Sequence, residues 1–212
     1  VVGIPASIQN LLNVTGMTIL NNFTAAYNSA CAVAAMGIAN KISMVPLYCA
    51  MGISQGIMPL ISYNYASGNI KRMKQSITFT TKISLGIIIV LAAGLYLGSG
   101  SVIAAFLNEP EVISYGARFL HGMSLALPFL CIDFVAVGVF QACGMGGKSL
   151  IFALMRKLVL EIPALFVLDK LFPLYGLAYA QLVAEVVLAA AAVIVLSKMF
   201  RRLQNERGLQ NG

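Results

Sequence analysis

Long apolar segments recur along this sequence with few charges inside them, and they constrain the fold more than any other feature. A helix needs about 20 mostly apolar residues to cross the hydrocarbon of a bilayer. Six segments meet that length: residues 4–26, 32–65, 77–97, 112–142, 149–172 and 174–196. The sequence therefore predicts an all-α, polytopic membrane protein, with a lobe of six transmembrane helices over residues 1–200 and a basic tail over 201–212.

The composition excludes a soluble globular domain. Only 10% of the residues are charged and 59% are hydrophobic, whereas a soluble domain is about half apolar and one quarter charged. The 14 basic and 7 acidic residues are too few to cover the outside of a water-soluble protein of this length. The outer surface is therefore predicted to face membrane lipid.

Basic residues gather in alternate connections between the predicted helices. They are Lys71, Arg72 and Lys74 after the second helix, Lys148 with Arg156 and Lys157 after the fourth, and Lys198, Arg201, Arg202 and Arg207 after the sixth. The other connections are uncharged, acidic or neutral. Because Lys and Arg favour the cytoplasmic side of a membrane, we expect both ends of the chain in the cytoplasm. This alternation also accounts for the net charge of +7, so no nucleic-acid partner is expected.

Motifs for enzymatic or cofactor chemistry are weak. Residues 146–149 resemble the tail of a phosphate-binding loop, but Ala142 stands where that loop needs glycine. His121 is the only histidine, and the four cysteines have no metal-ligand spacing. We therefore expect no enzyme activity, no cofactor and no metal site built from Cys and His.

The stretch from Gly52 to Tyr65 combines small residues with a proline. Gly52 and Gly56 are four residues apart, a spacing that lets a neighbouring helix approach closely. Pro59 frees the backbone carbonyl of Gln55 and favours a bend in the helix, as Pro128 does in the fourth predicted helix. The stretch either shapes and packs a bent helix or contacts a substrate, and the packing role is the simpler interpretation.

This stretch resembles the signature of the multidrug and toxic compound extrusion (MATE) family. Further segments resemble that family in the same order: 3–9, 34–42, 128–129, 140–144 and 162–163. The resemblance implies the C-terminal lobe of a twelve-helix transporter in the bacterial inner membrane. It implies that an N-terminal six-helix lobe of the same polypeptide is the partner, which fits a sequence that opens on Val1. It also implies export of small organic cations in exchange for protons or sodium.

Ionisable residues inside spanning helices cost roughly 2.5–3.5 kcal/mol on insertion scales, so each is a candidate functional residue. Asp133 has no Lys or Arg three or four positions away. Its carboxylate is therefore expected to be protonated, hydrated or bound to a cation, or to pair with Arg156 of the next helix. The resemblance implies a sodium-coupling role for Asp133. Asn13 stands where the sodium-coupled branch has a glutamate, which leaves proton or sodium coupling open.

Two further carboxylates complete the ion and substrate candidates. Glu161 follows Lys157 by four residues, so a local ion pair is expected. Glu185 lies near the middle of the sixth predicted helix with Gln181 four residues before it and no basic residue within a turn. Polar packing and a proton-sensitive role are both open for Glu185.

Two other functions are alternatives to drug export. A lipid-linked oligosaccharide flippase of the same superfamily needs a basic cavity for pyrophosphate, and this sequence has few basic residues deep in its helices. A scaffold without transport activity does not need carboxylates in the middle of the membrane. The sequence therefore favours the export of organic cations.

Overall fold

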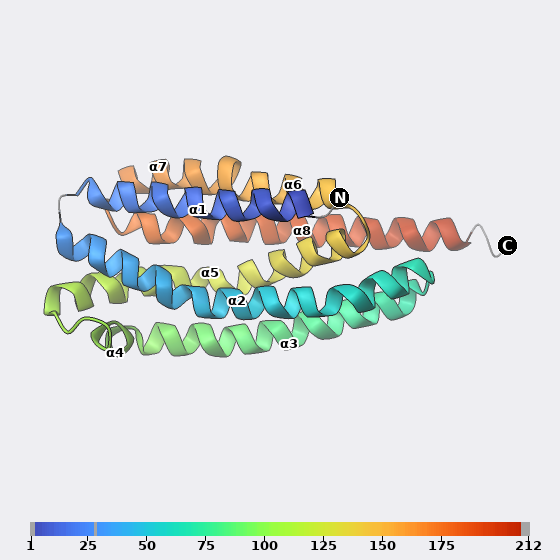
Figure 1. The fold of residues 1–212 in the computed structure, drawn as a ribbon, viewed down its shortest axis with the longest axis horizontal. Coiled ribbons are helices and arrows are strands. Elements are labelled where there is room, and N and C mark those ends of the chain that lie inside the picture. The colour runs from blue at the N-terminus through green and yellow to red at the C-terminus, as the bar shows by residue number, and fades with distance from the viewer. Residues whose placement is uncertain (1–2, 28, 209–212) are drawn as a thin grey trace.

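Every regular element in the described part of the chain is a helix. The computed structural model describes residues 3–27 and 29–208 (Figure 1). The elements are α1 (Gly3–Ala25), α2 (Ala30–Ala66), α3 (Ile70–Leu97), α4 (Ser99–Ala104), α5 (Pro110–Ala142), α6 (Gly146–Leu154), a π-helical segment η1 (Met155–Glu161), α7 (Ile162–Leu171) and α8 (Gly176–Gly208). The all-α prediction is confirmed.

Four helices of the described chain are long and apolar enough to cross a membrane. They are α2, α3, α5 and the part of α8 from Gly176 to Leu203. The first and fifth predicted segments correspond to α1 and to the continuous run α6–η1–α7, which lie alongside the others (Figure 1). Helix α1 contains Asn10, Asn13, Asn21 and Asn22, whereas the run is interrupted by the π-helical segment and contains several charged residues.

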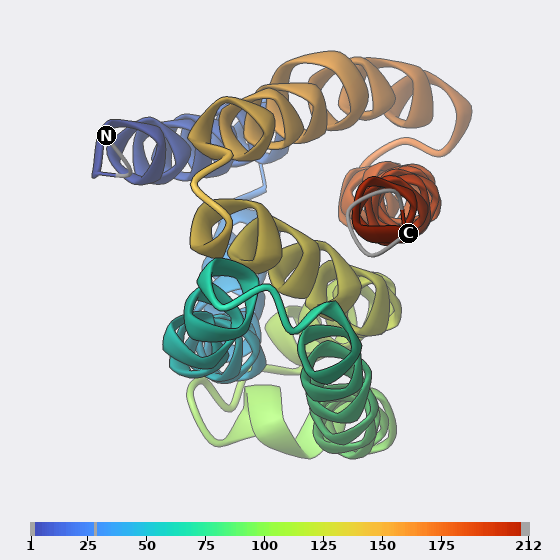
Figure 2. The same cartoon turned by 90° about the vertical axis from the view of Figure 1, so that its right-hand side faces the viewer.

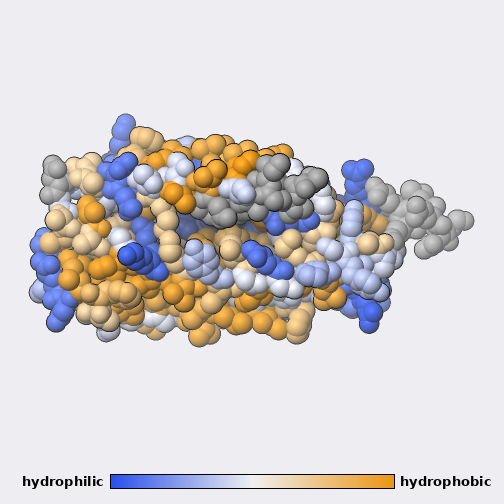
Figure 3. Space-filling model, viewed as in Figure 1, coloured by the Kyte–Doolittle hydropathy of each residue, from blue (hydrophilic) through white to orange (hydrophobic). Residues whose placement is uncertain are grey.

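Helix α5 occupies the centre of the bundle, with α2, α3 and α8 around it (Figure 2). In its most apolar stretch 78% of the residues are buried, against 22% in the peripheral α3. On the side of α5 that faces away from α3, α1 packs beside α6 (Figures 1 and 2). On the face drawn in Figure 3, hydrophobic residues cover most of the sides, and hydrophilic residues gather mainly towards the two ends. This distribution suits a surface in contact with lipid.

Several helix boundaries differ from the predicted ones. Helix α3 begins at Ile70 rather than at residue 77, because the Asn69 side chain accepts a hydrogen bond from the Arg72 backbone N–H and caps the helix. Helix α8 continues to Gly208 rather than ending at 196, so most of the predicted tail is helical; residues 209–212 lie outside the described range. The short helix α4 was not predicted. A run of apolar residues indicates only the part of a helix that lies in hydrocarbon. Lys and Arg are good helix formers, so a helix can extend through them beyond that run.

The turns α2–α3 and α5–α6 share one construction. Gly68 has φ 69° and Gly144 has φ 73°, and each follows a helix as its left-handed terminating residue. The next residue closes the turn by a backbone hydrogen bond of 2.8 Å, from Asn69 N to Asn64 O and from Met145 N to Phe140 O. Both turns lie at the end of the bundle where α1 begins and α8 ends (Figure 1). The basic connections of the sequence thus share one end.

Gly144→Ala is expected to lower the free energy of unfolding by about 1–2 kcal/mol, because a side chain is strained at positive φ. The matched control is Gly147→Ala, three residues later and within α6, where no atom lies within 4 Å of an added Cβ. There the expected change is neutral or slightly stabilising. Thermal unfolding of the complete protein in detergent measures both, and equal shifts would contradict the turn geometry.

Candidate functional site

Three charged side chains from different helical segments meet inside the bundle. Nη1 of Arg156, in η1, lies 3.4 Å from Oδ2 of Asp133, in α5, and 4.0 Å from Oε1 of Glu185, in α8. Their exposed fractions are 3%, 1% and 1%. The arginine also lies over the Phe134 ring, with its Cζ 5.4 Å from the ring centroid. We call Arg156, Asp133 and Glu185 the buried charge cluster.

The cluster revises three predictions from the sequence. Asp133 is not an unpaired carboxylate, and the alternative, pairing with Arg156, is confirmed. Arg156 is not part of a basic connection at the membrane surface but is buried between α5 and α8. Glu185 has a basic partner that lies outside its own helix, so the sequence could not reveal it within one turn.

The π-helical segment places Arg156 in this position. At its end the Ile162 N–H bonds to the Lys157 carbonyl, five residues earlier instead of four. Pro163 follows directly, and it has no N–H with which to reach the carbonyl of Val159. The proline therefore favours the wider turn. On this segment Arg156 faces α5 and α8, while its neighbour Lys157 contacts α1 at Gly16.

The buried charge cluster holds one positive and two negative side chains when all are ionised. One oxygen of Asp133 (Oδ1) and one of Glu185 (Oε2) accept no hydrogen bond from any described group. A buried charge in excess is costly, so one proton or one monovalent cation would make the cluster neutral. The described residues contain no group of three or more acidic, His or Cys side chains arranged for a metal ion.

A second ion pair lies next to the cluster. Lys157 Nζ is 2.6 Å from Glu161 Oε1, and the two side chains are 12% and 10% exposed. The predicted local pair is confirmed. Lys157 packs against Gly16 of α1, where an added Cβ would lie 3.0 Å from its Nζ. The absence of a side chain at position 16 leaves room for the lysine.

This ion pair lines a cavity of about 470 Å³ that is bounded by α1, α2, α5, η1 and α8. Its polar lining residues are Asn40, Ser43, Tyr48, Lys157, Glu161 and Gln181, and its methionines are Met17, Met44, Met51 and Met123. Methionine side chains are flexible and polarisable, so they adapt to apolar ligands of different shapes. The cavity combines such a surface with the Lys157–Glu161 ion pair, a lining that suits an apolar ligand carrying a charged group.

The glycines of the predicted packing motif do not pack against another helix of this chain. No atom lies within 4 Å of a Cβ added at Gly52 or Gly56, because the buried face of α2 carries Ser54, Ile57 and Ile61. Because no helix of the described chain lies against them, their packing against a neighbouring helix stays a prediction. The close helix contacts occur instead at three glycines of α5: Gly116 against Ile103 of α4, Gly122 against Ala178 of α8 and Gly138 against Ser54 of α2.

The remaining candidates are distributed over two helices. Gln55 and Pro59 are exposed on α2, which continues through Pro59 and curves along its length (Figure 1). Pro128 lies within α5, one turn before Asp133. Asn13 belongs to α1, but its side chain lies outside the described part of the structure. The sequence candidates Asp133 and Glu185 therefore share the buried charge cluster, and Glu161 lies in the adjoining cavity.

The family model of MatE matches residues 5–167, which is most of the chain. The chain belongs to the MatE family. The Multidrug export protein MepA of Staphylococcus haemolyticus is 34% identical to it over 204 residues, and its namesake in Staphylococcus saprophyticus is 32% identical over 203 residues. Each alignment covers 95% of this MatE chain and 44% of the relative. The relatives are transporters, not enzymes.

Solved structures of MATE transporters have the same fold. One in complex with MaL6 matches with a TM-score of 0.90 at 20% identity, over 96% of this chain and 46% of the other. The Vibrio cholerae transporter VcmN in its bent form matches with a TM-score of 0.87 at 20% identity, over 95% and 46% of the two chains. The MatE chain is thus an integral membrane protein that spans slightly less than half the length of the relatives it matches.

Proposed function

We propose that this chain is the C-terminal lobe of a secondary active multidrug exporter. The complete protein would exchange organic cations for protons or sodium ions by alternating access between two six-helix lobes. Its proposed location is the bacterial inner membrane, with both ends in the cytoplasm. The buried charge cluster is the observation that carries this proposal, since it joins α5, η1 and α8 beside a ligand-sized cavity.

The coupling argument rests on the excess negative charge of the cluster. Asp133 and Glu185 compete for Arg156, at 3.4 Å and 4.0 Å respectively. Binding of a proton or a cation to either carboxylate would shift the arginine towards the other one. Because the three side chains belong to three segments, this shift would alter the contacts of η1 with α5 and α8. Ion binding would thereby favour one packing of the lobe over another.

The cavity supports organic cations as the cargo. Glu161 lines it and is neutralised by Lys157, so a cation that displaces the lysine would gain the carboxylate as its partner. A lipid-linked pyrophosphate would instead need several unpaired basic groups. Lys157 is the one basic residue among the described lining residues, and it is already paired. The flippase alternative therefore receives no support from the lining.

The exposed face of α2 supports an N-terminal lobe as the partner. Val45, Tyr48, Gly52, Gly56 and Pro59 are all exposed on that helix at spacings of three or four residues, and Val45 and Tyr48 are 62% and 57% exposed. They form one continuous stripe along the helix. Since the relatives are about twice as long as this chain, we propose that the N-terminal lobe packs on this stripe, with the two glycines at the closest approach.

Asp133→Asn in the complete protein is expected to reduce ion-driven export of a fluorescent cation such as ethidium by roughly tenfold or more. A tenfold effect corresponds to a coupling free energy in the range usual for two linked sites. The variant should still fold, because Arg156 keeps Glu185 as its partner. Export is measured in proteoliposomes under an imposed proton or sodium gradient, and the effective gradient identifies the ion. Glu111→Gln, an exposed carboxylate on the same helix, is the matched control. Undiminished export by Asp133→Asn would remove the cluster from the mechanism.

A further inference from the structure

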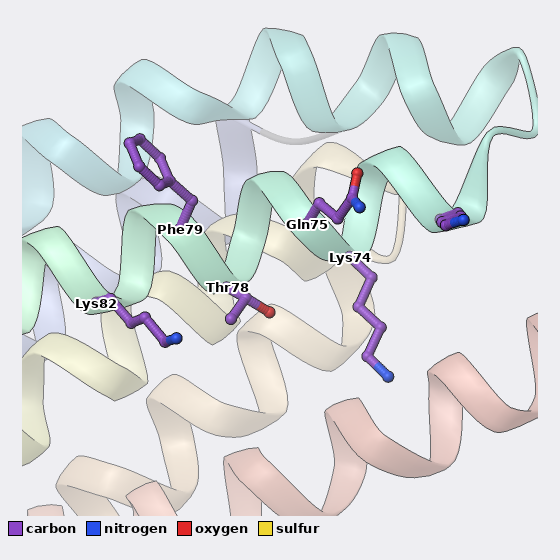
Figure 4. A pocket seen from close by; sticks show the side chains of 6 residues that line it. Lys74, Gln75, Thr78, Phe79 and Lys82 are labelled. Carbon is purple, nitrogen blue, oxygen red and sulfur yellow. The ribbon is translucent and has the colours of Figure 1, made fainter.

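A basic groove lies on α3, and none of its lining residues belongs to the buried charge cluster. It has a volume of about 730 Å³ and is lined by Lys71, Lys74, Gln75, Thr78, Phe79 and Lys82. Lys71, Lys74, Thr78 and Lys82 follow one another at intervals of three and four residues, so they form one stripe along the helix. Figure 4 shows the side chains of Lys74, Thr78 and Lys82 extending from the same side of α3.

The stripe runs from the polar end of the bundle into its apolar part. Helix α3 has 28 residues, which span about 42 Å at 1.5 Å per residue, whereas the hydrocarbon of a bilayer is about 30 Å thick. Lys71 and Lys74 belong to the first two turns, whereas Lys82 lies about 12 Å further along the helix than Lys74. Its exposed neighbours Phe79 and Ile83 are apolar. Lys82 therefore carries a charge close to or inside the boundary of the hydrocarbon.

No acidic residue belongs to α3 or to the two helices before it. The first acidic residue of the sequence is Glu109, so α1, α2 and α3 contain none. The ion pairs of Arg156 and Lys157 are formed by other segments, η1 with α5 and α8 and η1 within itself. A charge at the depth of Lys82 requires a counter-ion or contact with water. A ligand with a negative head and an apolar body would supply the counter-ion and also cover Phe79.

We propose that this groove binds an anionic phospholipid. The phosphate would lie between Lys74 and Lys82, with the Thr78 hydroxyl as an additional hydrogen-bond donor, and an acyl chain would extend along Phe79 and the apolar face of α3. A zwitterionic lipid carries no net charge to offset the lysines, so the groove discriminates between lipid classes by charge. In the proposed orientation this lipid lies in the cytoplasmic leaflet, and that assignment rests on the proposed function. Lipid binding itself does not depend on drug export.

The test uses native mass spectrometry of the complete protein in detergent, with phosphatidylglycerol and phosphatidylcholine as probes. The wild type is expected to retain phosphatidylglycerol preferentially. The triple variant Lys71→Gln, Lys74→Gln and Lys82→Gln should lose roughly 10- to 100-fold of that affinity. A matched triple removes three exposed basic residues outside the groove at the same end, Lys148→Gln, Lys198→Gln and Arg201→Gln, and should bind as the wild type does. Equal binding by wild type and groove variant, or equal losses in both triples, would overturn the proposal.

Two further measurements locate and identify the ligand. Lys82→Gln alone should weaken phosphatidylglycerol binding more than Lys41→Gln, a lysine that is likewise exposed but lies on α2 outside the groove. Glycerophosphoglycerol, which is the same phosphodiester without acyl chains, should not displace the lipid at millimolar concentration. Displacement would assign the groove to a soluble phosphate and overturn the lipid proposal. Unchanged thermal unfolding of each variant ensures that the losses report binding.

Discussion

Arg156→Met is expected to lower the free energy of unfolding by about 3–5 kcal/mol, the usual cost of removing one partner from a buried ion pair. The methionine has a similar length but leaves Asp133 and Glu185, each 1% exposed, without their shared positive charge. The two carboxylates would then repel each other across the interface of α5 and α8. Thermal unfolding in detergent and the yield of monodisperse protein measure the effect.

The reason for the loss can be isolated by removing all three charges. The triple variant Arg156→Met, Asp133→Asn and Glu185→Gln contains no buried ion in the cluster, so most of the stability should return. Gradient-driven export should nevertheless be lost in the triple variant, because no group is left to bind the coupling ion. A single Arg156→Met variant as stable as the wild type would show that the cluster does not hold the helices together.

The general fold could be predicted from the sequence because apolar segments of membrane length have few alternative structures. The predicted bounds of the central helix α5 agree with the structure to within two residues, since Pro110 begins the helix after Glu109 and Gly144 follows its end. The start of α3 and the end of α8 were missed for a common reason. Lys71, Lys74 and Lys198 continue their helices beyond the apolar part, and hydrophobicity does not report helical structure outside the hydrocarbon.

The members of the buried charge cluster could be recognised from the sequence, but their arrangement could not. Asp133 and Glu185 are carboxylates without a basic neighbour on their own helices, and Arg156 is a base inside an apolar segment. Complementary charges of this kind on different helices indicate a contact between them. What the sequence does not specify is the rotation of each helix about its axis. For Arg156 that rotation depends on the π-helical segment, of which Pro163 is the one local indication.

The glycines illustrate the same limit. Gly52 and Gly56 have a spacing typical of close helix contacts, yet both are exposed on α2 within this chain. Neighbouring helices approach Gly116, Gly122 and Gly138 of α5 instead, although these glycines lie six and sixteen residues apart and match no packing motif. Which glycine is essential for packing depends on which face of its helix meets a neighbour. The contact at Gly138 permits a direct test.

Gly138→Ala is expected to lower the free energy of unfolding by about 2–4 kcal/mol, through overpacking and a lost hydrogen bond. A Cβ at this position would overlap Oγ of Ser54 on α2 and lie 3.3 Å from the Ser54 carbonyl oxygen. Ser54 Oγ donates a buried hydrogen bond of 2.7 Å to the Phe134 carbonyl. The new methyl group must therefore displace the hydroxyl from its acceptor or push α2 away from α5. Either change weakens the packing of the two helices, and thermal unfolding in detergent measures the loss.

A compensating substitution identifies the cause of this loss. In the double variant Gly138→Ala and Ser54→Ala the overlapping oxygen is absent, and the two Cβ atoms would be 3.7 Å apart, an ordinary contact. Most of the stability should return. Gly86→Ala is the matched control, because it lies on the exposed side of α3 with no atom within 4 Å of the added Cβ, and an alanine there should be neutral or slightly stabilising. Full stability of the single Gly138→Ala variant would mean that α2 and α5 are less closely packed at this point than their contact indicates.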